Sequence, residues 1–362
     1  MNTAPMRLGF PVKVMARADL KSNDTRRWQK NPHLKVSLEY IDGILDHLAR
    51  HKISMYRMSS DLAPYATHPD MPQFHNMVAE SDAELRAVGE KARRLDIRLS
   101  FHPSQFVLLN SPDPELTRKS VWDLSSQAEM LDRMGLGPEA VLVTHVGGTY
   151  GDIPASRARW AETWTTLPEP VRRRPVLEHD DLRFSAADVL WIHEQTGVRL
   201  IFDYQHFWCL NPERLDMVDA LRRILKTWPD DVRPKIHYSS PRTELRELKR
   251  RDRKTKKLTK VLLPPVWTGH ADFTNPFEFA RFMRDAEGLV FDVMLESKSK
   301  DLALLKLRTD LVRYAPDVAQ RFGLGAGAVI GLGEEEPLPS DLPADEADPD
   351  EGARSLPNEA RV

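Results

Sequence analysis

Histidines and carboxylates repeatedly follow short apolar runs in this sequence. Residues 200–202 are apolar, and Asp203 and His206 come soon after them. A continuous apolar run is typical of a buried parallel strand, and a carboxylate and an imidazole at its end suit metal coordination better than packing. The same pattern places further polar side chains at strand ends: His68, His102, His145, Glu178, Lys235, His237, His270 and Glu296.

Imidazole and carboxylate groups together favour zinc, manganese or iron over calcium. The six histidines and three carboxylates of this set exceed what one ion needs, so we expect two or three divalent ions. Two-metal sites stabilise the attacking and leaving oxygens of a phosphodiester displacement. A single histidine is more often an ordinary core or surface residue, and we keep that interpretation for the histidines away from strand ends: His33, His47, His51, His75 and His193.

Lys235 lies two residues before His237, so both side chains face the same side of a strand. Metal ions repel an ammonium, and we therefore expect this amine to be neutral or covalently modified, for example carboxylated to serve as a bridging ligand. The alternative is a lysine whose amine extends away from the site into water. The sequence leaves both interpretations open.

Residues 242–260 form a basic segment, with ten bases and three acids, between His237 and His270. A charged run is usually a solvated surface, here a helix with pairs of opposite charge. Its position beside the candidate ligands favours the phosphate backbone of a nucleic acid as its partner. We expect DNA contacts from Lys249, Arg250 and Arg251.

Gln105 and Phe106 follow His102 in a predicted loop. An amide next to an exposed aromatic ring can insert into a base stack. The alternative is a phenylalanine folded back onto the rim of the fold.

Eight predicted strands alternate with predicted helices and position these side chains. The strands lie near residues 7–14, 53–58, 97–102, 140–145, 175–181, 198–202, 234–239 and 289–296. Ser37 is expected to cap one helix, and Ser81 with Glu84 to form a capping box at the start of another. This alternation predicts an α/β fold, a (β/α)8 TIM barrel whose strand ends meet at one mouth. A doubly wound sheet is the alternative, but the glycine-rich phosphate loop that usually accompanies it is missing.

The composition, 41% hydrophobic and 29% charged over 362 residues, predicts a soluble globular protein. No apolar run approaches the roughly 20 residues of a membrane-spanning helix, and no secretory signal is recognisable. Because Cys209 is the single cysteine, an internal disulfide is excluded and we expect a cytoplasmic protein. Nothing in the sequence indicates an oligomer, so we expect a monomer.

The net charge of −2 hides an uneven distribution. Residues 334–351 hold nine acids and no base, whereas residues 1–333 hold 50 bases and 44 acids. Glycine, proline and acidic residues dominate from residue 323 onward, which leaves too few apolar residues for a core. We expect one TIM-barrel domain over residues 1–322 and a disordered acidic tail over residues 323–362.

The ordered series of motifs resembles the bacterial and fungal UV damage endonucleases of the UvdE type. The resemblance covers about residues 6–320 and rests on RLGF, RMSSD, SFHPSQF, THVGG, LEHDD, FDYQHF, PKIHYSS, GHADF and MLESKSKD. It implies a (β/α)8 barrel similar to endonuclease IV, with a multi-metal site that usually holds manganese. It also implies incision of DNA immediately 5′ of cyclobutane pyrimidine dimers, 6-4 photoproducts and some abasic sites.

Carried over residue by residue, the resemblance implies metal ligands at His68, His102, His145, Glu178, Asp203, His206, His237, His270 and Glu296. Catalytic roles fall on Lys235, His237, Glu178 and Glu296, with Lys235 matching the lysine that is carboxylated in this family. Gln105 and Phe106 match the pair that probes the damaged strand, and Phe10 and Lys298 complete the expected DNA contacts. Phe10 and Phe106 stand where the family often has tyrosine. His179 stands where asparagine is common, and its role is open.

We therefore expect a metal-dependent DNA repair endonuclease that acts on double-stranded DNA with UV lesions, since a damaged base pair costs less to unstack than an intact one. The alternative is a sugar isomerase or epimerase on the same barrel. The basic segment and the loop with Gln105 and Phe106 disfavour it. A DNA-binding module without catalysis fits poorly with so many potential ligands.

Overall fold

The computed structural model describes residues 4–244, 246–251, 255 and 257–325. Eight parallel strands lie at its centre: β1 (Leu8–Pro11), β2 (Met55–Arg57), β3 (Arg98–Ser100), β4 (Leu142–His145), β5 (Pro175–Glu178), β6 (Arg199–Ile201), β7 (Lys235–Tyr238) and β10 (Asp292–Leu295). Hydrogen bonds join them into two sheets, in the orders β3-β2-β1-β10-β7 and β4-β5-β6. Single parallel bridges, Phe101 to Leu142 and Asp203 to His237, connect the two sheets at both edges. The strands therefore form a closed ring, and the predicted (β/α)8 barrel is confirmed.

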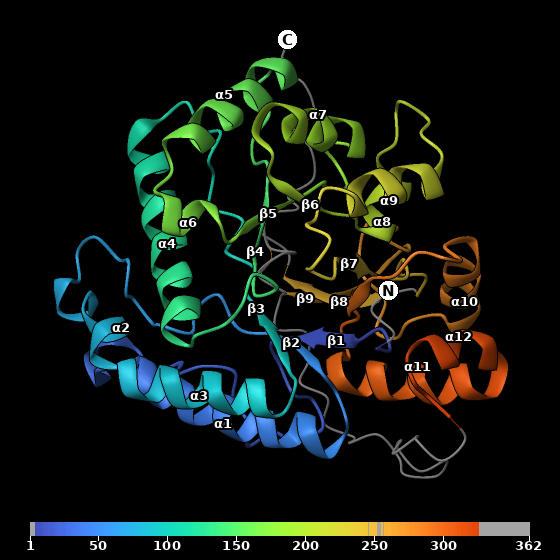
Figure 1. The fold of residues 1–362 in the computed structure, drawn as a ribbon, viewed down its shortest axis with the longest axis horizontal. Coiled ribbons are helices and arrows are strands. Elements are labelled where there is room, and N and C mark those ends of the chain that lie inside the picture. The colour runs from blue at the N-terminus through green and yellow to red at the C-terminus, as the bar shows by residue number, and fades with distance from the viewer. Residues whose placement is uncertain (1–3, 245, 252–254, 256, 326–362) are drawn as a thin grey trace.

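A long helix follows each barrel strand and packs on the outside of the ring (Figure 1). These helices are α1 (Leu34–Arg50), α3 (Asp82–Arg94), α4 (Pro114–Arg133), α5 (Ile153–Thr166), α7 (Ala186–Thr196), α9 (Met217–Leu225), α10 (Pro276–Asp285) and α11 (Lys300–Tyr314). Shorter helices occupy the connections: α2 (Met77–Glu80), α6 (Glu169–Arg172), α8 (Tyr204–Cys209), α12 (Pro316–Arg321), η1 (Trp28–Lys30) and η2 (Pro72–Phe74). Among the helices of the described ranges, none combines the length and apolar character needed to cross a membrane.

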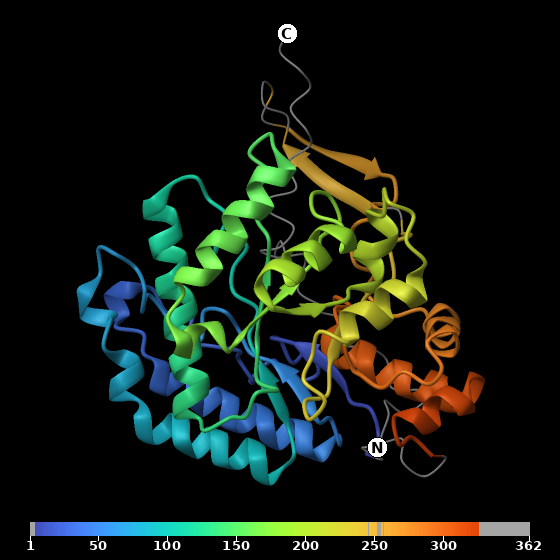
Figure 2. The ribbon, with the colours of Figure 1, turned by 45° about the horizontal axis from the view of Figure 1, so that its top comes forward.

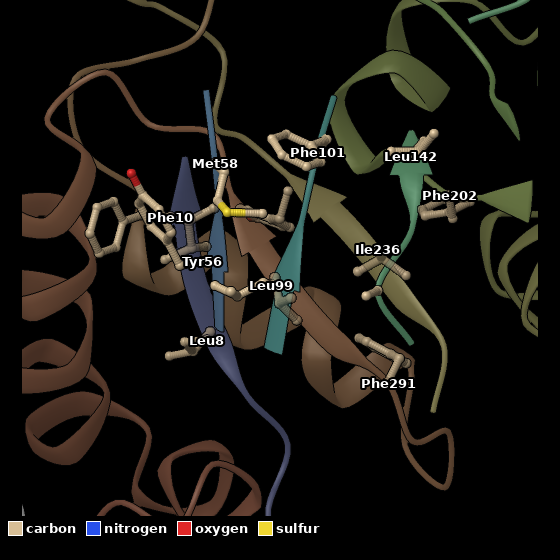
Figure 3. Packing of buried hydrophobic residues seen from close by; sticks show 14 of the residues in the cluster. Leu8, Phe10, Tyr56, Met58, Leu99, Phe101, Leu142, Phe202, Ile236 and Phe291 are labelled. Carbon is tan, nitrogen blue, oxygen red and sulfur yellow. The ribbon is translucent and has the colours of Figure 1, made fainter. Parts of the chain in front are cut away.

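Successive residues of each strand point alternately to the helices and to the barrel interior. The layer between strands and helices is the main apolar core. Figure 3 shows part of it, with Leu8 and Tyr56 on the neighbouring strands β1 and β2 and Ile236 on β7. A second apolar cluster contains Val143 and Val176. Each of these valines shares a strand face with a polar side chain two residues further on, His145 and Glu178 respectively. Inward-facing columns of side chains thus change from apolar to polar toward the strand ends.

The opposite end of the barrel is closed by a buried ion pair. Nη1 of Arg98, at the start of β3, lies 2.9 Å from Oδ2 of Asp292, at the start of β10. Nearby, a Cβ atom on Gly9 would lie 2.6 Å from the carbonyl oxygen of Met55, so only glycine permits this approach of β1 to β2. This end of the barrel therefore contributes to the stability of the fold.

Two predicted helix starts are wrong in detail. Helix α1 begins at Leu34, because Nδ1 of His33 accepts a hydrogen bond from Lys35 N and caps the helix, while the Ser37 hydroxyl accepts instead from Asp24 N. Ser81 precedes α3, but its side chain makes no capping hydrogen bond there. A complete capping box does form at the start of α7.

The basic segment between β7 and His270 contains a β-hairpin, which the sequence did not predict. Its strands β8 (Arg246–Arg251) and β9 (Leu258–Leu263) pair antiparallel. In Figure 2 the hairpin stands beyond the helices that surround the barrel. The segment is therefore a projecting arm on the mouth side and not a solvated helix.

The described part of the chain continues past α12 to residue 325. Leu324 is still buried against the core. The acidic residues 326–362, most of the predicted tail, lie outside the described residues.

Candidate metal centre

The strand register brings the predicted ligands to one end of the barrel. His145, the last residue of β4, pairs with Glu178, the last residue of β5. Asp203 is bridged to His237 of β7, and Glu296 directly follows β10, the neighbour of β7. Because parallel strands end at the same edge, these side chains converge at the C-terminal mouth.

Three overlapping groups place their ligand atoms within 4.8 Å of one another: His102 with His145 and Glu178, Glu178 with Asp203 and His206, and Asp203 with His237 and Glu296. Glu178 belongs to the first two groups and Asp203 to the last two, so the groups form one continuous centre. Seven of the nine predicted ligands are in it.

Glu178 lies in the middle of the centre and is almost fully buried. Its Oε1 is 2.9 Å from Nδ1 of His237 and 3.5 Å from Nδ1 of His206. Its Oε2 is 3.4 Å from Nε2 of His102 and 3.8 Å from Nε2 of His145. Burial alone would raise the pKa of Glu178, but the surrounding imidazoles, His237 first, hold that pKa well below its ordinary value. The carboxylate is therefore ionised.

Glu296 is ionised for a different reason. Burial would raise its pKa, but the Arg57 guanidinium, which donates a hydrogen bond to Glu296 Oε1, holds that pKa well below the ordinary value. Arg57 is the last residue of β2 and was missing from the predicted site. It is a polar residue at a strand end, so the rule that found the ligands could have found it.

Two buried atoms of the centre favour a cation. Oδ2 of Asp203 and Nε2 of His237 make no hydrogen bond within the described part of the chain. A buried polar atom left without a partner costs about 1–3 kcal/mol, and burial raises the pKa of Asp203 to about 6. A bound divalent ion would offset both costs. Imidazole with carboxylate is also the donor set of zinc, manganese and iron, so the residues fit metal ions.

His179 positions two ligands from behind the centre. Its Nε2 accepts a hydrogen bond of 3.0 Å from Asp203 N, and its carbonyl oxygen lies 3.0 Å from Nδ1 of His206. A carbonyl can only accept, so Nδ1 of His206 donates and Nε2 remains for a metal. Burial lowers the pKa of His179 to about 3, which keeps its imidazole neutral and able to accept. An amide oxygen could accept the same bond, which explains how asparagine can serve at this position.

We expect His179→Ala to weaken Mn²⁺ binding by about 10- to 100-fold, as is typical when a residue that orients metal ligands is removed. His179→Asn should retain most of the affinity, because its side-chain oxygen can still accept from Asp203 N. Isothermal titration of the apoprotein with Mn²⁺ measures this. His193→Ala, in α7, removes an imidazole that also bonds to the backbone, with its Nδ1 2.7 Å from Val198 O, and is the matched control. Equal losses in the alanine and asparagine variants would contradict the assignment.

Lys235 is fully buried on the inner face of β7. Its Nζ donates a hydrogen bond of 3.0 Å to Oγ of Ser100 on β3, a second residue missing from the predicted site. Burial lowers the pKa of Lys235 well below its ordinary value, and the positive charges of Arg98 and Arg57 lower it further. The alternative in which the amine extends into water is therefore wrong, and burial favours the uncharged form of the amine.

His68 and His270 are outside the three groups. Nε2 of His270 lies 4.0 Å from Oε2 of Glu296, at the edge of the centre, and its Nδ1 lies 3.1 Å from the Glu296 carbonyl oxygen. His68 lies in the loop after β2, where its Nδ1 accepts from Asp70 N. Both remain predicted ligands.

The residues predicted to contact DNA lie in three parts of the structure: the loop after β3, the segment after β10 and the hairpin. Phe106 is 72% exposed in the loop after β3, so it is not folded back onto the rim, and Gln105 beside it is half-buried. Lys298 is half-buried after β10, and Arg251 is exposed on the hairpin. Lys249 and Arg250 lie in the same strand, β8.

Phe10 requires a correction. It is fully buried and packs edge-on against Tyr56, with ring centroids 5.5 Å apart. Because Phe10 alternates with the inward-facing Gly9, it points into the layer between strands and helices. It has no surface to offer to DNA and is a core residue.

The fold and this centre define a (β/α)8-barrel enzyme with a candidate multi-metal centre at its C-terminal mouth. A family model described as UV-endonuclease UvdE matches residues 12–321. The chain belongs to the UV-endonuclease UvdE family, whose members are DNA-cutting hydrolases.

Known proteins agree with this assignment. The UV DNA damage endonuclease of Bacillus velezensis is 35% identical over 273 residues, 74% of this chain and 78% of that protein. That of Bacillus cereus strain B4264 is 31% identical over 308 residues, 83% of this chain and 89% of that protein. The crystal structure of SacUVDE matches with a TM-score of 0.70 and 31% identity, over 84% of this chain and 98% of that chain. A putative xylose isomerase from Rhodospirillum rubrum, at 14% identity and a TM-score of 0.51 over 89% of this chain and 99% of that chain, shares the fold alone.

Proposed function

We propose that this enzyme incises double-stranded DNA immediately 5′ of cyclobutane pyrimidine dimers, 6-4 photoproducts and some abasic sites. The observation that carries the proposal is the group of seven His, Asp and Glu side chains at the mouth of the barrel, in a chain of the UvdE family. The sugar isomerase alternative has no comparable support, because its likeness to this chain is one of fold alone.

The proposed ligands are the seven residues of the centre together with His68 and His270, and the proposed ions are two or three Mn²⁺. Such ions, when bound, polarise the scissile phosphate and neutralise charge that develops on its oxygens. The chain's own contribution is to hold ionised carboxylates and oriented imidazoles in a buried place. Arg57 fixes Glu296, and His179 fixes Asp203 and His206.

Lys235 is proposed to be carboxylated and to serve as a bridging ligand. Only a neutral amine reacts with carbon dioxide, and burial lowers the pKa of Lys235, which favours its neutral form. The reaction forms an N–C bond and releases one proton, which yields an anion among the cations. We also propose catalytic roles for Glu178, His237 and Glu296, since the His237 imidazole contacts both carboxylates.

The exposed Phe106 is proposed to enter the base stack at a lesion, with Gln105 contacting the bases. Lys249, Arg250, Arg251 and Lys298 are proposed to contact DNA phosphates, which fits the basic character of residues 242–260. We further propose that the enzyme acts as a monomer in the cytoplasm, where its DNA substrate lies.

We expect Phe106→Ala to lower kcat/KM for a dimer-containing duplex by about 5- to 100-fold, the range for loss of one base–aromatic stacking contact. Phe106→Tyr keeps the ring and should retain activity. Steady-state nicking of a labelled duplex measures both. Tyr314→Ala removes an exposed ring at the end of α11 and serves as the control. Wild-type rates in Phe106→Ala would remove this residue from the recognition step.

The function itself is tested with purified protein, Mn²⁺ and a 5′-labelled duplex that carries a single cyclobutane dimer. A nick immediately 5′ of the dimer, absent with EDTA and with undamaged duplex, is the expected result. No nick by protein shown to have bound Mn²⁺ would overturn the proposal.

A further inference from the structure

Two exposed tryptophans lie close in the sequence to candidate metal ligands. Trp208 lies two residues after His206, in α8, and Trp267 lies three residues before His270. Each is 62% exposed. Exposed tryptophans next to the proposed ligands are costly in water and indicate a surface that another molecule covers.

Hydrogen bonds hold these two tryptophans on one side of the mouth. The buried side chain of Gln205 donates to the carbonyl oxygens of Trp267, at 2.8 Å, and Gly269, at 3.0 Å. Gln205 and Trp208 are three residues apart on α8, so they lie on the same face of that helix. The segment with Trp267 is therefore tied to the helix face that carries Trp208.

The segment that leads into the hairpin is attached to the same stretch of chain, directly after Trp267. Arg242 N donates to Gly269 O at 2.8 Å, and Pro241 forms an antiparallel bridge with His270. The exposed apolar side chains of Leu258 and Leu262 lie on the hairpin itself, in β9. The segment that carries Trp267 is thus attached to the base of the basic arm and leads directly to the predicted ligand His270.

The charge of the arm decides which kind of molecule covers this surface. Residues 242–260 carry ten bases and three acids, so the surface attracts a polyanion. Aromatic rings beside a basic path are the arrangement that binds unpaired nucleotides, since every base has a face that stacks on a ring. A protein partner would have to be strongly acidic and would compete with the substrate at the mouth.

Phe106 lies on the other side of the mouth. It follows β3, whereas Trp267 follows β7, and these strands are four positions apart in the ring of eight. Opposite rims of the mouth thus carry one exposed phenylalanine and two exposed tryptophans. A ring that enters a base stack from one rim displaces bases toward the other.

We propose that Trp208 and Trp267 form a stacking surface for the unpaired bases of the damaged DNA site, opposite Phe106. The proposal rests on the proposed function and deepens it, because it names the element that receives the displaced bases. The surface binds any unpaired base by its face, so it favours lesions by their weakened pairing and not by their chemical structure.

The test is single-turnover nicking of the dimer-containing duplex, with the enzyme in excess at several concentrations. Trp267→Ala and Trp208→Ala should each raise the half-saturating enzyme concentration by about 5- to 100-fold. Trp267→Phe should stay near the wild type, and Trp267→Leu, which keeps apolar area without a ring, should behave as Trp267→Ala. Tyr314→Ala is the control for loss of an exposed ring. Thermal unfolding of each variant identifies any that fail to fold.

The outcomes separate this proposal from the function on which it rests. If the wild type does not nick the duplex, the proposed function fails. If the wild type nicks and both alanine variants saturate at wild-type concentrations, the stacking surface is wrong. If Trp267→Leu restores binding as well as Trp267→Phe, apolar contact and not stacking explains the surface, and the proposal is overturned.

Discussion

Glu178→Gln is expected to lower the rate of nicking at a cyclobutane dimer by at least about 1,000-fold, since metal ions supply several kcal/mol of transition-state stabilisation. Glu178 is shared by two of the three candidate ligand groups, and its two oxygens lie among four imidazoles. Glutamine has nearly the same shape, so the change removes charge and one strong metal ligand while it keeps the packing. The four neighbouring imidazoles would then lose the anion at their centre.

Rapid-quench nicking assays and Mn²⁺ titrations measure this effect together. The matched control is Glu194→Gln, on an exposed position of α7. Thermal unfolding of the apoprotein shows whether the variant is folded. A folded Glu178→Gln protein that nicks at the wild-type rate would show that this centre is not where the reaction occurs.

Removal of divalent ions is expected to abolish nicking and to destabilise the fold. At a free Mn²⁺ concentration about 100 times Kd, a single bound ion raises the free energy of unfolding by about 2.7 kcal/mol. Oδ2 of Asp203 and Nε2 of His237 would gain the partner that they lack among the described residues.

Differential scanning calorimetry of protein dialysed against EDTA, with and without added Mn²⁺, measures this stabilisation. Ca²⁺ prefers oxygen ligands, so it is the control ion and should raise Tm less at the same concentration. An unchanged Tm with Mn²⁺, combined with nicking in EDTA, would refute a metal centre built from these residues.

The barrel and the cluster of ligands were predictable from the sequence for one physical reason. Parallel barrel strands are buried on both faces, so they read as apolar runs, and a polar residue at their C-terminal end has few structural uses. That argument found Glu178, Asp203 and His237 without any knowledge of their contacts. The same argument would have found Arg57, had positive side chains at strand ends been considered as partners of the carboxylates.

Other features depend on contacts that the sequence does not express. The hairpin was missed because basic residues stand at both odd and even positions of residues 246–251 and hide the sequence alternation that identifies a strand. Phe10 was assigned to DNA through the family resemblance, although strand alternation directs its side chain to the helices. Ser37 has the composition of a helix cap, but His33 takes that place and the Ser37 hydroxyl bonds to Asp24 N.

The closed ring of strands contains two weak seams. Between β3 and β4, and again between β6 and β7, a single bridge replaces the ladder that joins the other neighbours. The seams divide the barrel into two arcs. His145 and Glu178 belong to one arc, and His237 and Glu296 to the other. Ions with ligands from both arcs would cross-link them, so metal binding would stabilise the closed barrel across the two places where its backbone pairing is weakest.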